Sequence, residues 1–321
     1  MNLMPRAKAL LFVGCAVLLA SVPESALAQQ SSPTAAASVQ HGIDLVETGH
    51  CQEALPLLKH GLPHVTDKAM RYHGRMAVVR CAMAIDDERT ATDTLLTMEQ
   101  ESPDDPEVLY IATHFFSELG MRAAQRLQAR APDSYQMKRL QAETLQSQGK
   151  NDQAAAIYQE ILKKHPKVSG IHYKLGQIAL AEAGASGSTD AAKHEFEQET
   201  EVDPTNASAE FVLGELDRRS GEFTDAVRHF TRATKLDVGF SEAYLALGMS
   251  LAASGKFAEA KAPLEAYVKM EPNDPAGHYQ LAIAYARTGD KEEAAREMAL
   301  QVKTTRAEGL VNTSQGHSVQ P

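Results

Sequence analysis

The sequence predicts an all-α array of helix–turn–helix units, and three observations support this fold class. Glycine recurs at a constant interval at Gly221, Gly255 and Gly289, and apolar side chains between these glycines stand at helical spacing. Prolines follow a related rhythm, with spacings close to that interval or twice it between Pro103, Pro132, Pro166, Pro204 and Pro272. A period of about 34 residues is typical of arrays in which each unit buries its apolar face only against its neighbours.

The clearest unit spans residues 241–274. Tyr244, Leu247 and Leu251 share one helical face. Gly255 is expected to end the first helix, because glycine adopts the left-handed cap conformation without strain. Pro272 is expected to end the second helix, because the residue before a proline is disfavoured in the helical region.

The segment 1–28 predicts a cleaved secretory signal. Arg6 and Lys8 precede a twelve-residue apolar run at 9–20, and Ala26 and Ala28 form a small-residue cleavage pattern. Twelve helical residues span about 18 Å, which is short for a bilayer core of about 30 Å. An uncleaved anchor and lipidation at Cys15 are the alternatives. Export to the periplasm or cell envelope follows from the signal, and no later apolar run reaches membrane-spanning length.

Composition argues against a nucleic-acid partner. The formal net charge is −10, and removal of the signal takes away two cations and one anion. An acidic chain without clustered Lys and Arg is a poor ligand for a phosphate backbone.

The units resemble the tetratricopeptide repeat (TPR) family. Gly248 and Ala260 match the small positions of that repeat, and Leu247 matches a large apolar one. The chain has no Trp, and the family's first aromatic position holds His172, Glu210, Tyr244 and His278 in successive units. The resemblance implies a right-handed α-solenoid at residues 37–303, with seven to eight units near 35–67, 72–105, 106–132, 135–168, 169–206, 207–240, 241–274 and 275–303.

Several segments depart from the regular period. Residues 29–36 are expected to form a flexible leader, and residues 304–321 a disordered tail. The unit at 106–132 is about five residues short, so its second helix is expected to be clipped. Residues 184–189 have a loop composition that absorbs four extra residues.

The chain lacks the short motifs of enzymes and cofactor-binding proteins. It has no GxxxxGK[ST], GxGxxG, GxSxG, HExxH or CxxC pattern. His194-Glu195 is not followed by a second histidine, since Gln198 occupies that place. A non-enzymatic protein without cofactor is therefore expected.

Cysteine and histidine suggest two further sites. In the TPR resemblance, Cys51 and Cys81 lie on helices that pack together, and an oxidising compartment favours a disulfide between them. Two separate buried thiols are the alternative. His60 and His64 stand four residues apart, but Gly61 and Pro63 interrupt a helix there, so exposed histidines are favoured over a metal site.

The resemblance also implies a concave groove lined by the first helix of each unit, where a protein or peptide partner binds. Aromatic and arginine side chains, which are frequent in binding hot spots, occur at these positions. An exposed row of Tyr173, Phe211, Leu245 and Tyr279 is expected, with padding of the core as the alternative. The residues of this chain that match the groove positions of the family are Tyr173, Gln177, Phe211, Glu215, Arg218, Arg219, Leu245, Met249, Tyr279, Ile283 and Arg287.

These features predict a non-enzymatic interaction scaffold or adaptor of the bacterial cell envelope. The main alternative is an accessory subunit of an envelope assembly machine, of the pilus or outer-membrane biogenesis type. A small-ligand or metal carrier built on the histidine-rich first units is a further alternative. An enzyme with its active site outside the repeats is disfavoured, because the leader and tail are short.

Overall fold

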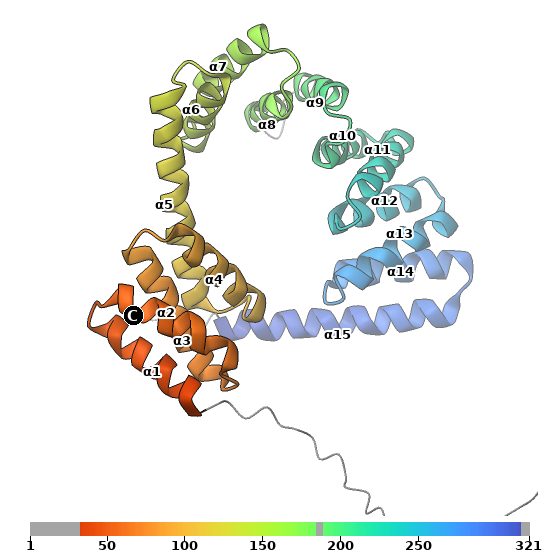
Figure 1. The fold of residues 1–321 in the computed structure, drawn as a ribbon. Coiled ribbons are helices and arrows are strands. Elements are labelled where there is room, and N and C mark those ends of the chain that lie inside the picture. The colour runs from red at the N-terminus through yellow and green to blue at the C-terminus, as the bar shows by residue number, and fades with distance from the viewer. Residues whose placement is uncertain (1–32, 184–188, 316–321) are drawn as a thin grey trace, which may run out of the picture. The chain divides into compact units, whose positions relative to one another are not determined.

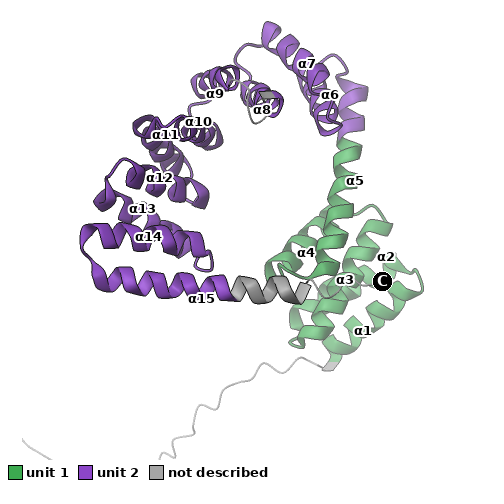
Figure 2. Cartoon of the chain, turned by 180° about the vertical axis from the view of Figure 1, so that it is seen from behind, with its two compact units in different colours: residues 1–123 green, residues 124–321 purple. Residues whose placement is uncertain are grey.

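A computed structural model describes residues 33–183 and 189–315 of the chain (Figure 1). These residues form fifteen α-helices and one short 3-10 helix, and none of them lies in a β-strand. The all-α prediction is therefore confirmed. Contacts divide the chain into two compact units, residues 1–123 and 124–321 (Figure 2). The predicted signal at 1–28 lies outside the described residues.

The first unit is built from two helical hairpins followed by the start of a long helix. Its elements are α1 (Pro33–Glu47), α2 (Cys51–Gly61), the 3-10 helix η1 (Leu62–His64), α3 (Lys68–Ala84), α4 (Glu88–Glu101) and α5 (Pro106–Arg130). Helix α3 packs on both α1 and α2. One buried cluster surrounds Leu58, between these three helices, and a second surrounds Leu95, where α3 and α4 meet Val108 and Phe115 of α5.

The second unit contains five helical hairpins in chain order. They are α6 (Tyr135–Ser147) with α7 (Asn151–Lys164), α8 (Ile171–Ala183) with α9 (Asp190–Val202), α10 (Ala207–Arg219) with α11 (Phe223–Leu236), α12 (Ser241–Ala253) with α13 (Phe257–Met270), and α14 (Pro275–Thr288) with α15 (Lys291–Gln315). The second helix of each hairpin also packs on the first helix of the next. The apolar core therefore runs from hairpin to hairpin, as the repeat predicts.

Small residues set the distance between the two helices of a hairpin. A Cβ atom added at Gly248 would lie 2.4 Å from Cγ of Leu264, and one at Gly214 would lie 2.7 Å from Cε1 of Phe230. Leu264 and Phe230 are fully buried. A side chain on either glycine would overlap a core residue, so the close approach of the helices depends on glycine at these positions.

The turns inside the hairpins follow the predicted glycines. Gly255 has φ +77°, and Gly221 has φ +80°. After Gly255 the amide of Lys256 donates to the carbonyl of Leu251 over 2.9 Å, which closes the end of α12. This left-handed geometry favours glycine and satisfies carbonyl groups left open at the end of a helix.

The segment expected to hold a clipped hairpin is a single helix. Helix α5 runs without a break through 25 residues, from Pro106 to Arg130. Asp105 begins it by accepting the amides of Glu107 and Val108 over 3.0 and 3.1 Å. The prediction of a short second helix at 106–132 is wrong, because Gly120, the glycine of this segment, does not adopt the positive φ of a turn and lies inside the helix.

The helical structure extends beyond both predicted ends of the solenoid, residues 37 and 303. Helix α1 begins at Pro33, so residues 33–36 are helical and not part of a flexible leader. Proline is tolerated at the first position of a helix. Helix α15 continues to Gln315, and the buried Thr304 hydroxyl donates to the carbonyl of Leu300. No proline interrupts the chain between Pro275 and Pro321, and the prediction of a disordered tail is therefore wrong for residues 304–315.

Parts of other predictions fall on residues that the structure does not describe. These are the leader residues 29–32, residues 184–188 of the predicted loop, and residues 316–321 of the predicted tail.

Candidate functional site

The predicted partner-binding residues lie on the first helices of four successive hairpins of the second unit. Tyr173 is on α8, Phe211 on α10, Leu245 on α12 and Tyr279 on α14. Phe211, Leu245 and Tyr279 each occupy the fifth position of their helix, and they follow one another at the interval of the repeat. Equivalent positions on stacked hairpins present their side chains in the same direction relative to each hairpin.

The aromatic row is only partly on the surface. Tyr279 is 46% exposed, whereas Tyr173, Phe211 and Leu245 are half-buried. The Phe211 ring packs on Phe240, with ring centroids 4.8 Å apart. The prediction of four exposed side chains is therefore wrong for three of them, because each also fills space between neighbouring helices.

Charged side chains cluster at the ends of the same helices. On α10, Glu215 accepts two hydrogen bonds from Arg218, at 3.0 Å to Nε and 2.8 Å to Nη2. This pairing raises the pKa of the Arg218 guanidinium above its ordinary value. Arg219 is exposed, and Arg287 at the end of α14 lies 4.8 Å above the ring of Phe257. Arg219 and Arg287 have no ion-pair partner among the described side chains.

The other predicted positions are less distinctive. Gln177 on α8, Met249 on α12 and Ile283 on α14 are all half-buried. Together with Tyr279 they supply apolar and amide surface next to the charged ends of the helices.

A buried ionic network beside this face was missed by sequence reasoning. Glu210 on α10 is 2% exposed; one carboxylate oxygen lies 2.7 Å from Nδ1 of His229, and the other lies 3.0 Å from Nε of Arg232. Asp217 is also buried, and its Oδ1 accepts from Lys193 over 2.6 Å. Its Oδ2 has no hydrogen-bond partner within the described residues and lies 3.6 Å from Nε2 of His229.

Two other hairpins contain the same kind of pair. His172 on α8 lies 2.7 Å from Glu195 on α9, and His278 on α14 lies 2.6 Å from Glu297 on α15. In each hairpin one partner stands at the family's first aromatic position, which holds no Trp in this chain. A charged residue or histidine at that position was the signal in the sequence for a buried polar pair. It did not show which residue of the second helix would be its partner. We interpret these pairs as links between the two helices of a hairpin.

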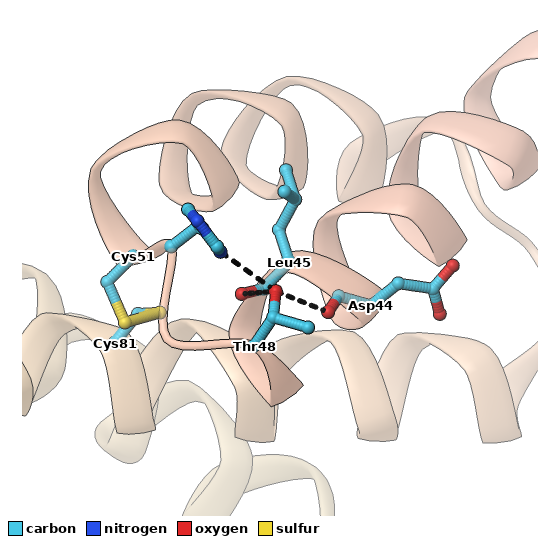
Figure 3. Close-up of a disulfide and its surroundings, with 6 residues drawn as sticks. Asp44, Leu45, Thr48, Cys51 and Cys81 are labelled. Carbon is cyan, nitrogen blue, oxygen red and sulfur yellow. Dashed lines mark hydrogen bonds between the residues drawn. A yellow bond between two sulfur atoms is a disulfide. The ribbon is translucent and has the colours of Figure 1, made fainter.

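In the first unit, Cys51 and Cys81 are joined by a disulfide in the structure (Figure 3). Cys51 begins α2 and Cys81 lies within α3, with Cα atoms 4.9 Å apart. The turn before Cys51 is held by Thr48, whose hydroxyl donates to the carbonyl of Leu45 over 3.1 Å and lies 2.9 Å from Nδ1 of His50. This turn places the start of α2 against α3.

The two histidines considered as metal ligands lie on either side of a helix end, with His60 in the last turn of α2. Helix α2 ends at Gly61, and His64 belongs to η1. The rings of His60 and His64 meet edge to face, with centroids 6.1 Å apart. Within residues 33–183 and 189–315, no group of three His, Cys, Asp or Glu side chains is arranged to hold a metal ion. In the same ranges no helix combines the length and apolar character needed to cross a bilayer.

Comparisons with solved structures identify the fold. The chain resembles YrrB, described as a TPR protein with an unusual peptide-binding site, at 20% identity and a TM-score of 0.50 over 60% of this chain and 98% of that one. It also resembles MamA, at 19% identity and a TM-score of 0.48 over 58% and 97% of the two chains. MamA from Desulfovibrio magneticus RS-1 gives 16% identity and a TM-score of 0.46, covering 55% and 97%. A comparison with curated proteins finds no match.

The sequence pattern of one family matches the chain directly. The tetratricopeptide repeat pattern matches residues 139–185, 182–239, 211–260 and 245–307. This repeat is typically non-catalytic and forms scaffolds for protein–protein interaction. Because the matched segments together cover more than half of the chain, the protein belongs to the tetratricopeptide repeat family.

Proposed function

We propose that this protein is exported to the bacterial cell envelope, where it acts as a non-enzymatic scaffold that holds a segment of a partner protein. The partner segment lies against α8, α10, α12 and α14. The signal-like residues 1–28 and the absence of enzyme motifs support this proposal from the sequence. The fold shared with YrrB, which is described as having a peptide-binding site, favours a peptide segment as the ligand.

The observation that carries the binding proposal is the exposure of Tyr279. A tyrosine ring that is 46% exposed supplies a rigid apolar surface and a hydroxyl group, which are frequent in binding hot spots. Phe211 and Leu245 occupy equivalent positions on the two preceding first helices. Their partly exposed edges extend the same apolar surface.

Charge indicates which partner segment this surface prefers. Glu215 neutralises Arg218, whereas Arg219 and Arg287 have no ion pair among the described residues. A segment that alternates apolar and acidic side chains would place its carboxylates beside these two arginines. Exposed charges of this kind increase the rate and the specificity of association more than the affinity.

Site-directed photocrosslinking in intact cells tests the binding site. A photoreactive residue at position 279 should capture a partner, whereas the same residue at Val238, which is 76% exposed in the turn between α11 and α12, should not. Tyr279→Ala should weaken capture, and the double variant Phe211→Ala with Tyr279→Ala should abolish it. Val238→Ala is the matched control for removal of an exposed apolar side chain.

Circular dichroism at 222 nm verifies that each variant keeps its helices. Phe211 also packs on Phe240, so its replacement can unfold part of the chain. If the double variant loses helicity, capture by the single variant Tyr279→Ala decides the test. Unchanged capture by folded Tyr279→Ala and by the double variant would exclude this surface. N-terminal sequencing of the protein from fractionated cells tests export separately, with Gln29 expected as the first residue.

A further inference from the structure

A cavity of about 400 Å³ opens in the first unit, where the beginning of α3 meets the end of α4. It is separate from the partner-binding surface proposed on α8 to α14, and it has its own chemistry. The residues that line it are Lys68, Arg71, Tyr72, Arg75, Met98, Glu101 and Ser102. Three of these side chains are cations and one is a carboxylate, in a chain whose net charge is −10.

The single carboxylate of the cavity is already paired. Glu101 is hydrogen-bonded by Arg75. That hydrogen bond, with the positive charges of Arg75 and Arg71, holds the pKa of Glu101 below its ordinary value. Lys68 has no ion-pair partner among the described side chains. Glu101 compensates one of the three positive charges, and within the described residues no ion pair joins it to Lys68 or Arg71.

Arg71 is the residue that most needs a further partner. Its Nε atom is buried and has no hydrogen-bond partner within the described residues. Its Nη1 donates only to the carbonyl of Val65, over a long 3.5 Å. Buried donors in folded proteins are almost always satisfied, and those that are not call for an explanation such as a bound group.

Two carboxylates that neighbour lining residues, Asp67 before Lys68 and Asp105 hydrogen-bonded to Tyr72, are engaged elsewhere. Asp67 accepts the amide of Met70 over 2.7 Å at the start of α3. Asp105 accepts the amides that begin α5 and also the Tyr72 hydroxyl over 3.2 Å. Neither carboxylate group is hydrogen-bonded to the side chain of Lys68 or Arg71 within the described residues, although the amide of Arg71 donates to the backbone carbonyl of Asp67.

We propose that this cavity binds an organic anion, in which a carboxylate or phosphate group is carried on a small apolar body. The anionic group pairs with Arg71 and Lys68, since the planar guanidinium fork suits the oxygens of both groups. The apolar body lies against Met98 and the ring of Tyr72. A cavity of about 400 Å³ has room for such a body, because a water molecule takes only about 30 Å³.

The alternative is that the cations only stabilise the end of α4. Positive side chains interact favourably with the carbonyl groups at a helix C-terminus. In that case Arg71 would contribute to stability, and no anion would bind selectively. A binding measurement separates the two roles, because a purely structural arginine gives no preference between charged and neutral ligands of the same shape.

Isothermal titration calorimetry on the full chain, at constant ionic strength, tests the proposal. The probes are benzoate, phenyl phosphate and inorganic phosphate, with neutral benzamide as the shape control. Benzoate or phenyl phosphate should bind at least about tenfold more tightly than benzamide, a difference equal to about 1.4 kcal/mol. The tighter of the two anions identifies the preferred group, and weaker binding of inorganic phosphate would demonstrate the role of the apolar walls.

Substitutions locate the site. Arg71→Gln should weaken binding of the preferred anion by about tenfold or more, and Arg71→Lys should restore part of the loss. Arg89→Gln on α4, whose side chain is 92% exposed, is the matched control and should change the affinity by less than about twofold. If Arg71→Gln loses helicity, Lys68→Gln replaces it.

Three results would overturn the proposal. They are the absence of binding up to about 10 mM anion, equal affinity for benzamide and benzoate, and unchanged affinity in the folded Arg71 or Lys68 variants. None of them bears on the partner-binding surface of the second unit, which has its own test.

Discussion

The packing of a glycine against a buried aromatic ring gives the sharpest stability prediction. Gly214→Ala in α10 adds one methyl group that faces Phe230 of α11. Gly120→Ala in α5 adds the same methyl group where no atom lies within 4 Å. Both glycines lie inside helices, so the gain in helix propensity is about 1 kcal/mol in each case. The two substitutions therefore differ mainly in what the methyl group contacts.

The structure sets the size of the difference. The new methyl group at position 214 would lie 2.7 and 2.8 Å from two ring carbons of Phe230. Phe230 is fully buried, and its ring already packs on Phe211 with centroids 5.6 Å apart. Overpacking a core in this way costs about 1–3 kcal/mol. Gly120→Ala should stabilise α5 by about 1 kcal/mol. Gly214→Ala should leave the α10–α11 hairpin unchanged or destabilise it by up to about 2 kcal/mol.

Amide hydrogen exchange read by mass spectrometry measures both effects, because it reports the free energy of local opening for each helix. Protection of α5 should rise in Gly120→Ala, and protection of α10 and α11 should not rise in Gly214→Ala. Adding Phe230→Leu to Gly214→Ala should relieve the overlap, with a favourable coupling of about 0.5–3 kcal/mol. Equal stabilisation by the two alanines would refute the packing argument.

Three further predictions follow from the core, the disulfide and a buried hydroxyl. Leu247→Ala should cost the α12–α13 hairpin about 2–5 kcal/mol, measured by the same exchange experiment, since Leu247 is only 8% exposed. Reduction, or the double variant Cys51→Ala with Cys81→Ala, should lower the unfolding free energy of the first unit by about 3–4 kcal/mol for a sequence separation of 30; urea unfolding of the variant should not respond to a reductant. Burial, aided by the charge of Glu143, raises the pKa of the Tyr158 hydroxyl to about 12. The stability linked to this neutral hydroxyl is complete below pH of about 10 and is lost as the pH rises toward 12, so Tyr158→Phe should reduce the alkaline shift of the urea midpoint.

The regular hairpins were predictable from the sequence because their determinants are local. A glycine in the turn, and a small residue opposite a large one, act within one unit and recur with the repeat. Gly255 is followed by Lys256 and Phe257, and the chain reverses there with φ +77°. Gly120 is followed by Met121 and two further helix-forming residues, and it does not adopt a positive φ. The helix-forming residues after Gly120 therefore indicated one long helix, although the repeat period favoured a turn at this glycine.

The surface of the candidate site was less predictable, because exposure depends on residues from neighbouring helices. Phe211 follows the repeat pattern as well as Tyr279 does. However, Phe240, in the turn before α12, covers part of the Phe211 ring. Phe240 stands 29 residues after Phe211, whereas the position 29 residues after Tyr279 lies inside α15 and not in a turn. Which aromatic ring stays open is therefore decided by a turn residue that the repeat does not conserve within this chain.

The disulfide between Cys51 and Cys81 also limits how the unfolded chain can be threaded through a narrow pore. Once the bond has formed, residues 51–81 are a closed loop, and two strands of this loop would have to enter the pore side by side. A pore that is only wide enough for one strand cannot accommodate them. Any machine that threads the polypeptide will stall at this loop until a reductant opens it. Oxidation must therefore come after passage through such a pore. A protease that pulls the chain inward from its C-terminal end would stop at Cys81 and leave the looped N-terminal fragment undigested.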